Sequence, residues 1–179
     1  MKRALVLSTV VAVSLSSPGL SALKPGSKAP EFSALASLAG KEFSFSLASA
    51  LKKGAVILYF YPAAFTEGCT LEAHEFAEAV EEFARLDATV IGVSRDSIEV
   101  LDRFSVSECR NKFAVAADTD GKISKAYDAV LNDNPAYSNR TSYVIAPDGK
   151  IIYEYTNLDY AKHVSNALLA VKAWKESKK

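Results

Sequence analysis

Seven consecutive apolar residues, 55–61, run without a polar interruption until Pro62 ends them. Their sequence, AVILYFY, is rich in the β-branched and aromatic side chains that strands favour. A run that shows no alternation of polar and apolar residues is typical of a strand buried on both faces, in the centre of a sheet. The run therefore favours folds in which helices cover both sides of a central sheet.

Strand-like and helix-like segments alternate along the rest of the chain. Apolar residues recur at helical spacing in residues 69–85, the alternating residues 42–47 predict an N-terminal hairpin, and Asp96 with Glu99 resembles a capping box that opens a helix through Phe104. Further strands are expected at residues 88–94, 113–117, 141–146 and 151–156, and further helices at 122–130 and 160–175. This order predicts an α/β protein with a thioredoxin-like fold, in which helices flank a central mixed β-sheet extended by the N-terminal β-hairpin.

The first 22 residues have the composition of a secretory signal peptide. A basic start is followed by the apolar residues 4–16 and by the small residues 17–22. The apolar stretch is too short to span roughly 30 Å of hydrocarbon, so no stable membrane anchor is expected. We interpret residues 1–22 as a signal peptide with an open cleavage site, and residues 23–179 as a single domain. The protein is then exported, to the periplasm; without a signal, residues 1–22 are a strand or frayed helix of a cytoplasmic protein.

Charge and cysteine content exclude several classes of partner. The 21 basic residues balance the 21 acidic ones, so the chain lacks the basic surface that nucleic acid or anionic lipid requires. The two cysteines, Cys69 and Cys109, are too few for a zinc cage, and we expect neither a metal nor an organic cofactor. Two cysteines are enough for one reversible disulfide.

The segment from Tyr61 to Ala73 contains the residues with the clearest chemical role. It places Cys69 in the first turn of the helix that follows the central strand, where free backbone N–H groups and the helix dipole favour the thiolate. The hydroxyl group of Thr66, three residues earlier, is in reach of that thiolate or of a bound oxygen atom, and Pro62 shields the site with apolar surface. The spacing therefore predicts a nucleophilic thiol.

These residues resemble the signature of the peroxiredoxins, and within them of the bacterioferritin-comigratory or Q-type branch. The resemblance extends from about Leu23 to the C-terminus and includes residues 92–97 and 139–145. The signature is Pro, three residues, Thr, two residues, Cys, Thr, one residue and Glu, which here are Pro62, Thr66, Cys69, Thr70 and Glu72.

The resemblance implies a thiol-dependent peroxidase that reduces hydrogen peroxide and alkyl hydroperoxides in antioxidant defence. It implies that Cys69 is the peroxidatic cysteine, that Arg140 is the active-site arginine, and that Glu72 orients this arginine. Arg140, Thr66 and backbone N–H groups would stabilise the negative charge that builds on the departing oxygen when the O–O bond breaks. By residues alone, Arg140 would be a loop residue paired with a surface acid.

Cys109 is the candidate resolving cysteine. Many Q-type members place that cysteine five residues after the peroxidatic one, but His74 occupies this position here. Others place it on the helix after the second strand, and helical spacing from Leu101 puts Cys109 at the border of the apolar stripe, where we expect it to be accessible. Cys109 would then form an intramolecular disulfide with Cys69, which a thioredoxin-like protein or a small thiol reduces. The alternative is a one-cysteine mechanism with an external thiol, because the two positions can lie more than about 7 Å apart and then meet only after local unfolding.

Three other readings of the sequence compete with the peroxidase. A dithiol oxidoreductase is excluded, because it requires Cys-x-x-Cys and the chain has Thr66-Glu-Gly-Cys69. An exported copper carrier would use Cys69, His74 and Cys109 as ligands, although His74 and His163 are both expected on helix surfaces. The third is a non-catalytic binding module of the same fold. The resemblance allows a monomer or a homodimer.

Overall fold

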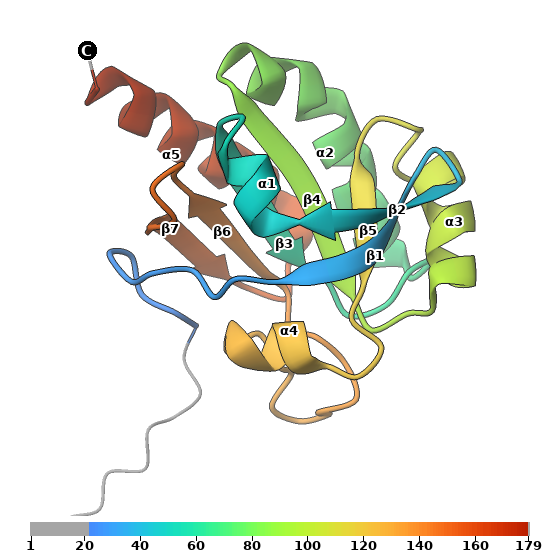
Figure 1. Ribbon diagram of the computed structural model, residues 1–179. Helices are drawn as coiled ribbons and strands as arrows, with labels where there is room; N and C mark the ends of the chain where they lie inside the picture. Colours follow the sequence, from blue (N-terminus) through green and yellow to red (C-terminus); the bar gives the residue numbers. More distant parts are fainter. Residues whose placement is uncertain (1–21, 179) are drawn as a thin grey trace, which may run out of the picture.

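A computed structural model describes residues 22–178. The predicted signal peptide, residues 1–22, is outside these residues except for Ala22. The described chain forms one sheet with helices packed on it (Figure 1). The strands are β1 (Ser33–Leu38), β2 (Lys41–Ser46), β3 (Ala55–Phe60), β4 (Ala88–Ser94), β5 (Ala114–Ala117), β6 (Thr141–Ile145) and β7 (Ile151–Thr156). The helices are α1 (Leu47–Leu51), α2 (Glu67–Arg85), α3 (Ile98–Ser107), α4 (Lys122–Ala126), the 3-10 helix η1 (Tyr160–Lys162) and α5 (His163–Glu176).

The strands form a mixed sheet in the order β2-β1-β5-β4-β3-β6-β7. β3 pairs in parallel with β4 and antiparallel with β6, and all of its residues are buried. β1 and β2 form the N-terminal hairpin and join the sheet through an antiparallel pairing of β1 with β5. The sequence-based predictions of a central buried strand, a mixed sheet and an N-terminal hairpin are therefore confirmed.

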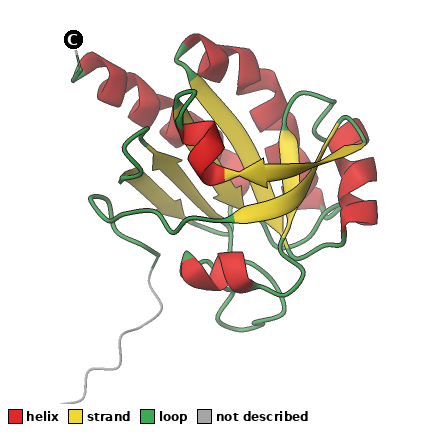
Figure 2. Ribbon diagram, in the orientation of Figure 1, coloured by secondary structure: helices red, strands yellow, loops and turns green. Residues whose placement is uncertain are grey.

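Helices cover both faces of the sheet (Figure 2). Because side chains alternate along a strand, Ile57 and Tyr59 of β3 belong to the core that includes residues of α2, α3 and α5. Leu58 and Phe60 point to the opposite core, which includes residues of α1 and the segment after α4. Within residues 22–178, no helix has both the length and the apolar composition that crossing a membrane requires.

The expected capping box before α3 is wrong. Ser97 is the N-cap of α3, and its side chain makes no capping hydrogen bond. Asp96 instead turns toward the loop after β3, where its Oδ2 accepts hydrogen bonds from the backbone N–H of Ala64, at 2.8 Å, and from Oγ of Ser94, at 2.7 Å. The carboxylate therefore ties the end of β4 to the loop that precedes α2.

The helix expected at residues 122–130 is shorter than predicted. α4 ends at Ala126, and Asp128 has a positive φ of 51°, which a helix cannot continue. Tyr127 is fully buried, and its hydroxyl group donates to the carbonyl oxygen of Pro30 at 2.7 Å. The helix ends early because this ring is buried in the core that Leu58 and Phe60 also enter. The segment expected as one helix at 160–175 begins with the 3-10 turn η1 before α5.

Candidate active site

Cys69 lies in the first turn of α2, directly after the loop that follows the central strand β3. Thr66 is the N-cap of the helix, and Phe65 before it has a positive φ of 63°. A left-handed phenylalanine is uncommon, and the surrounding structure must hold it in place. Its ring packs edge-on against Phe104 of α3, with centroids 5.2 Å apart, while Asp96 holds Ala64. Contacts from α3 and the end of β4 thus fix the loop that carries the site.

The Cys69 thiol is buried, with 2% of the residue exposed, and a guanidinium group lies beside it. Nη2 of Arg140 is 3.5 Å from Sγ of Cys69. The same guanidinium group donates through Nη1 to Oε2 of Glu72 and through Nε to the carbonyl oxygen of Leu158, at 2.8 Å. Burial alone would lower the pKa of Arg140, but Glu72 and Cys69 raise it, so the group is cationic. Its positive charge is thus held beside the sulfur atom by two hydrogen bonds, to Glu72 and to Leu158.

Glu72 lies one helical turn after Cys69 and is fully buried. Burial raises the pKa of its carboxyl group, and the interaction with Arg140 opposes this increase. Arg140 therefore pairs with a buried acid, not with a surface acid. The structure thus brings together three of the expected site residues, Cys69, Glu72 and Arg140.

Gly68 gives the Arg140 side chain room to approach the start of α2. A Cβ atom at this position would lie 3.2 Å from Nη2 of Arg140, which is tighter than most Cβ contacts. Sequence reasoning did not single out this glycine. The only signal available was its place directly before Cys69, within the first turn of a helix where glycine is otherwise unfavourable.

Thr66 and Pro62 lie at the open side of the site. Pro62 is half-buried in the loop, whereas Thr66 is exposed. The hydroxyl group of Thr66 donates its one proton to the carbonyl oxygen of Ala63, at 2.9 Å. Because this one proton is used, the hydroxyl group does not donate to the Cys69 thiolate, and it cannot at the same time donate to a departing oxygen, the other role expected of it. The hydroxyl oxygen keeps its capacity to accept a hydrogen bond from a bound molecule.

Cys109 differs from expectation, because it is fully buried and not accessible. α3 ends at Ser107 with Glu108 as its C-cap, and the backbone N–H groups of Glu108 and Cys109 both bond to the carbonyl oxygen of Phe104. This tight end turns Cys109 inward. Both cysteines are free and belong to the same buried cluster, and burial followed by the nearby Glu108 raises the pKa of the Cys109 thiol.

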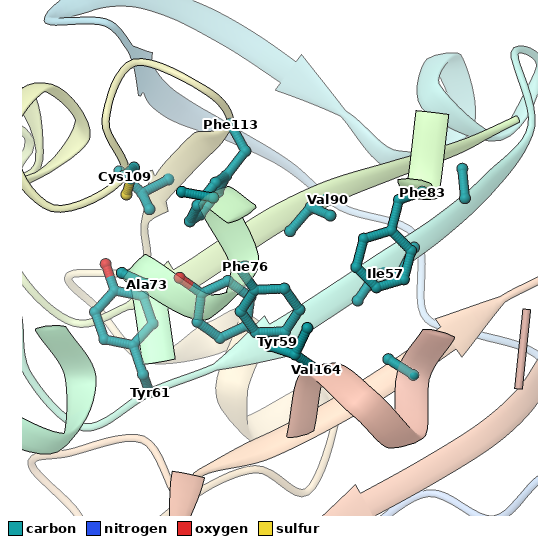
Figure 3. Close-up of a cluster of buried hydrophobic side chains, with 14 of the residues drawn as sticks. Ile57, Tyr59, Tyr61, Ala73, Phe76, Phe83, Val90, Cys109, Phe113 and Val164 are labelled. Atoms are coloured by element: carbon teal, nitrogen blue, oxygen red, sulfur yellow. The ribbon is translucent and has the colours of Figure 1, made fainter. Parts of the chain in front are cut away.

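Two tyrosines of β3 lie in the cluster that holds both cysteines. Figure 3 shows Cys109 on the side of the cluster to which the hydroxyl groups of Tyr59 and Tyr61 point. The two rings stack with centroids 5.4 Å apart. Burial raises the pKa of both hydroxyl groups, and the nearby Cys109 raises it further. Cys109 is therefore enclosed by an aromatic core that holds its thiol in the neutral form.

Three ion pairs fasten the segment that contains Cys109 to the outer face of α2. We call this set the ion-pair ladder, and it joins residues one helical turn apart on α2 to alternate residues of 108–112. The segment includes two consecutive residues with positive φ, Arg110 and Asn111, at 51° and 60°. The three pairs of the ion-pair ladder are His74 with Glu108 at 2.9 Å, Glu78 with Arg110 at 3.1 Å and Glu81 with Lys112 at 3.4 Å.

His163 was expected on a helix surface but is fully buried at the start of α5. Oγ of Ser142 lies 2.8 Å from its Nδ1, and the carbonyl oxygen of Asn157 lies 2.9 Å from its Nε2. Its Nδ1 is also 3.7 Å from Oε1 of Glu72. One signal in the sequence indicated burial: His163 precedes the buried residues Ala167 and Val171 at steps of four.

The candidate copper ligands do not come together. Within the described part of the chain, no group of three or more His, Cys, Asp or Glu side chains is arranged to hold a metal ion. His74 uses its ring nitrogen in the contact with Glu108, and Cys109 lies in the aromatic cluster. The alternative of a copper carrier built on Cys69, His74 and Cys109 is therefore wrong.

Known proteins share both the sequence pattern and the fold. The sequence model of the AhpC/TSA family matches residues 25–154. The peroxiredoxin Bcp of Bacillus subtilis is 36% identical over 127 residues, which cover 68% of this chain and 80% of that protein. The span matched by the family model includes the positions of Cys69, Glu72 and Arg140.

Two solved structures extend this likeness to three dimensions. The structure of peroxidoxin BcpB from Mycobacterium tuberculosis superposes on this chain with a TM-score of 0.77 at 27% identity. The superposed region covers 84% of this chain and 97% of that one. Peroxiredoxin Q from Xanthomonas campestris gives a TM-score of 0.70 at 27% identity, and covers 79% of this chain and 90% of that one. The thioredoxin-like fold expected from the order of elements is thereby confirmed.

Proposed function

Since this chain belongs to the AhpC/TSA family, in its Bcp-like branch of peroxiredoxins, and is a thiol-dependent peroxidase of antioxidant function, we propose that Cys69 is the residue that attacks the peroxide. One observation carries this assignment. Nη2 of Arg140 lies 3.5 Å from Sγ of Cys69, whereas Cys109 lies in an aromatic cluster that favours the neutral thiol. Only Cys69 has a cation beside it that stabilises the nucleophilic thiolate.

The chemical step follows from this geometry. The Cys69 thiolate attacks one peroxide oxygen, an S–O bond forms, and the O–O bond breaks. Sulfur is oxidised to a sulfenic acid, and the second oxygen leaves as water or an alcohol after it takes up one proton. The Arg140 guanidinium group stabilises the charge on the departing oxygen, and the Thr66 oxygen accepts a hydrogen bond from the peroxide. The substrates are hydrogen peroxide and small alkyl hydroperoxides.

Several features support the roles of the neighbouring residues. Glu72 binds Arg140 through Nη1 and leaves Nη2 facing the sulfur atom. Thr66 donates its proton to Ala63, which fixes its oxygen as an acceptor. Pro62 lies in the loop between β3 and α2 and limits the access of water to the thiolate. These contacts support a site in which an acceptor, a cation and the nucleophile surround the peroxide.

We propose further that Cys109 resolves the sulfenic acid. Its thiol attacks Sγ of Cys69, a disulfide forms, and the sulfenic oxygen leaves as water. Burial of Cys109 requires the 108–112 segment to open first, and the two left-handed residues in this segment favour such opening. A thioredoxin-like protein or a small thiol then reduces the disulfide. In the one-cysteine alternative, an external thiol attacks the sulfenic acid directly.

The setting in which the enzyme works is also a proposal. Residues 1–22 are proposed to direct export to the periplasm, where the compartment is oxidising and the reductant must receive its electrons through a membrane relay. The enzyme is proposed to act as a monomer or a homodimer. Mass spectrometry of the protein recovered from the periplasm would detect loss of residues 1–22, and recovery of the protein only from the cytoplasm, with an intact N-terminus, would contradict export.

Peroxide consumption tests the assignment of Cys69. With dithiothreitol as the reductant, we expect the wild-type protein to consume hydrogen peroxide continuously and Cys69→Ser to show no activity above buffer. We expect Cys109→Ser to retain activity, because dithiothreitol can also act as the external resolving thiol. Continued turnover by Cys69→Ser would overturn the assignment.

A further inference from the structure

One oxygen of the Glu72 carboxyl group lacks a hydrogen-bond partner among the described residues. Oε2 accepts from Arg140, but Oε1 is buried without a partner. Nδ1 of His163 lies 3.7 Å from Oε1, too far for a hydrogen bond and close enough for contact. Because a single hydrogen-bonded oxygen leaves a carboxyl group free to rotate, the ring of His163 is positioned to limit that rotation.

Hydrogen bonds fix the orientation of the His163 ring. The carbonyl oxygen of Asn157 only accepts, so Nε2, at 2.9 Å from it, carries the ring proton. Nδ1 is then the acceptor for the hydroxyl group of Ser142, at 2.8 Å. The ring of Tyr155 packs edge-on against the imidazole, with centroids 4.8 Å apart. His163 is therefore held from β6, from β7 and from the loop after β7.

The charged groups around His163 keep it neutral. Burial lowers its pKa to about 4; Arg140 also lowers it, while the carbonyl of Asn157 and the carboxylate of Asp159 oppose the change. The groups that face the ring are Glu72 from α2, Arg140 before β6, Tyr155 from β7 and Asp159 before η1. A neutral ring does not compete with Arg140 for the Glu72 carboxylate.

We infer that His163 is a positioning residue for the reaction with peroxide: its ring holds Glu72 in the orientation that presents the Arg140 guanidinium group to Cys69. This inference rests on the proposed function of Cys69 and Arg140. His163 itself touches neither the sulfur atom nor the peroxide. Displacement of a catalytic group by about 1 Å costs up to about 100-fold in rate, so we expect loss of the ring to cost about tenfold.

The test is a double-mutant cycle between His163 and Glu72. The variants are H163Q, E72Q and the pair, and the readout is the rate constant for reaction of the reduced protein with one equivalent of hydrogen peroxide. A glutamine places its amide nitrogen near the position of Nε2, so it keeps the contact with Asn157 but removes the ring beside Glu72. We expect H163Q to lose about tenfold in rate, and less than twofold when E72Q is already present.

A buried residue elsewhere in α5 separates positioning from simple loss of stability. Val171 is fully buried in the same helix, and V171A weakens helix packing without touching Glu72. We expect V171A to unfold more easily and to react with peroxide at the wild-type rate. If H163Q does not fold, H163N enters the same cycle, because asparagine places a polar atom near Nδ1; we expect its loss to be smaller than tenfold and again dependent on Glu72.

Two results would overturn the inference. One is a wild-type rate for the folded His163 variant, and the other is the same loss of rate with and without E72Q. Failure of the proposed function gives a different result, because Cys69→Ser, measured alongside, would then still react with peroxide. The experiment therefore distinguishes a wrong role for His163 from a wrong role for Cys69.

Discussion

Nη2 of Arg140 lies 3.5 Å from Sγ of Cys69, although 71 residues separate the two in the sequence. The contact is made possible by the central sheet, because Cys69 follows β3 and Arg140 directly precedes β6, the antiparallel neighbour of β3. Two further hydrogen bonds fix the guanidinium group, to Glu72 and to the carbonyl oxygen of Leu158. The cation is therefore in place before a peroxide arrives.

Replacement of this cation should slow the reaction with peroxide. We expect Arg140→Met to reduce the rate constant for oxidation of Cys69 by about 100- to 1000-fold, which is typical for loss of one preorganised donor. Stopped-flow measurement on the reduced protein gives this constant. Arg85→Met, at the exposed end of α2, is the matched control and should react normally. A loss smaller than tenfold in Arg140→Met would show that the guanidinium group is not a main source of rate.

Gly68→Ala should separate stability from activity. Alanine favours a helix over glycine by up to about 1 kcal/mol, so the free energy of unfolding should not fall. The new Cβ would lie 3.2 Å from Nη2 of Arg140 and displace the guanidinium group from Cys69. We expect the peroxide rate to fall severalfold in the wild-type background and to stay unchanged in the Arg140→Met background. Equal losses in both backgrounds would place the effect outside the Arg140 contact.

The ion-pair ladder should slow disulfide formation. Its pairs are mostly exposed, and each stabilises the closed segment by at most about 1 kcal/mol. Added salt, or removal of one charged side chain of a pair, should therefore ease opening of the 108–112 segment. We expect Glu78→Gln to form the Cys69–Cys109 disulfide faster after a pulse of peroxide, as followed by quenching and non-reducing electrophoresis. Glu82→Gln removes a pair with Lys172 on α5 and should have no effect. Equal rates in wild type and Glu78→Gln at low salt would contradict this role.

The buried His163 predicts a specific dependence of stability on pH. Its pKa in the folded protein, about 4, is below its unfolded value, so the unfolded state binds more protons between these values. Stability therefore falls as the pH falls from about 6.5 to about 4, with a contribution of about 3 kcal/mol from this one group. We expect chemical denaturation to show a smaller loss over this range for H163Q than for wild type. Identical pH dependence in the two proteins would exclude a buried neutral histidine.

The sequence was sufficient to predict the architecture because local patterns decide it. The unbroken apolar run of residues 55–61 can bury its side chains on both faces only in the centre of a covered sheet, and β3 occupies that place. The position of Cys69 at a helix start followed from the same pattern, since the strand ends at the loop with Pro62. The pairing of Cys69 with Arg140 came from family resemblance, because no local pattern relates residues so distant in the chain.

The errors concern residues whose surroundings come from distant segments. Helical spacing placed Cys109 at an accessible border, but α3 ends two residues before it and turns the thiol into the core. Asp96 looks like a helix cap in the sequence and instead holds Ala64 of the loop before α2. His163 is expected on a helix surface, whereas Ser142 and Asn157 bond to its ring nitrogens in the interior. Tertiary hydrogen bonds decide the positions of Asp96 and His163, whereas the end of α3 decides that of Cys109.

Intact mass under non-reducing conditions, after a slight excess of peroxide is added to the reduced protein, tests the account most directly. We expect wild type to lose about 2 Da through a Cys69–Cys109 disulfide, Cys109→Ser to gain about 16 or 32 Da on Cys69, and Cys69→Ser to show neither change. A gain of oxygen on wild-type Cys69 without a disulfide would support resolution by an external thiol. An unchanged mass in the wild-type protein would contradict the assignment of Cys69 as the residue that reacts with peroxide.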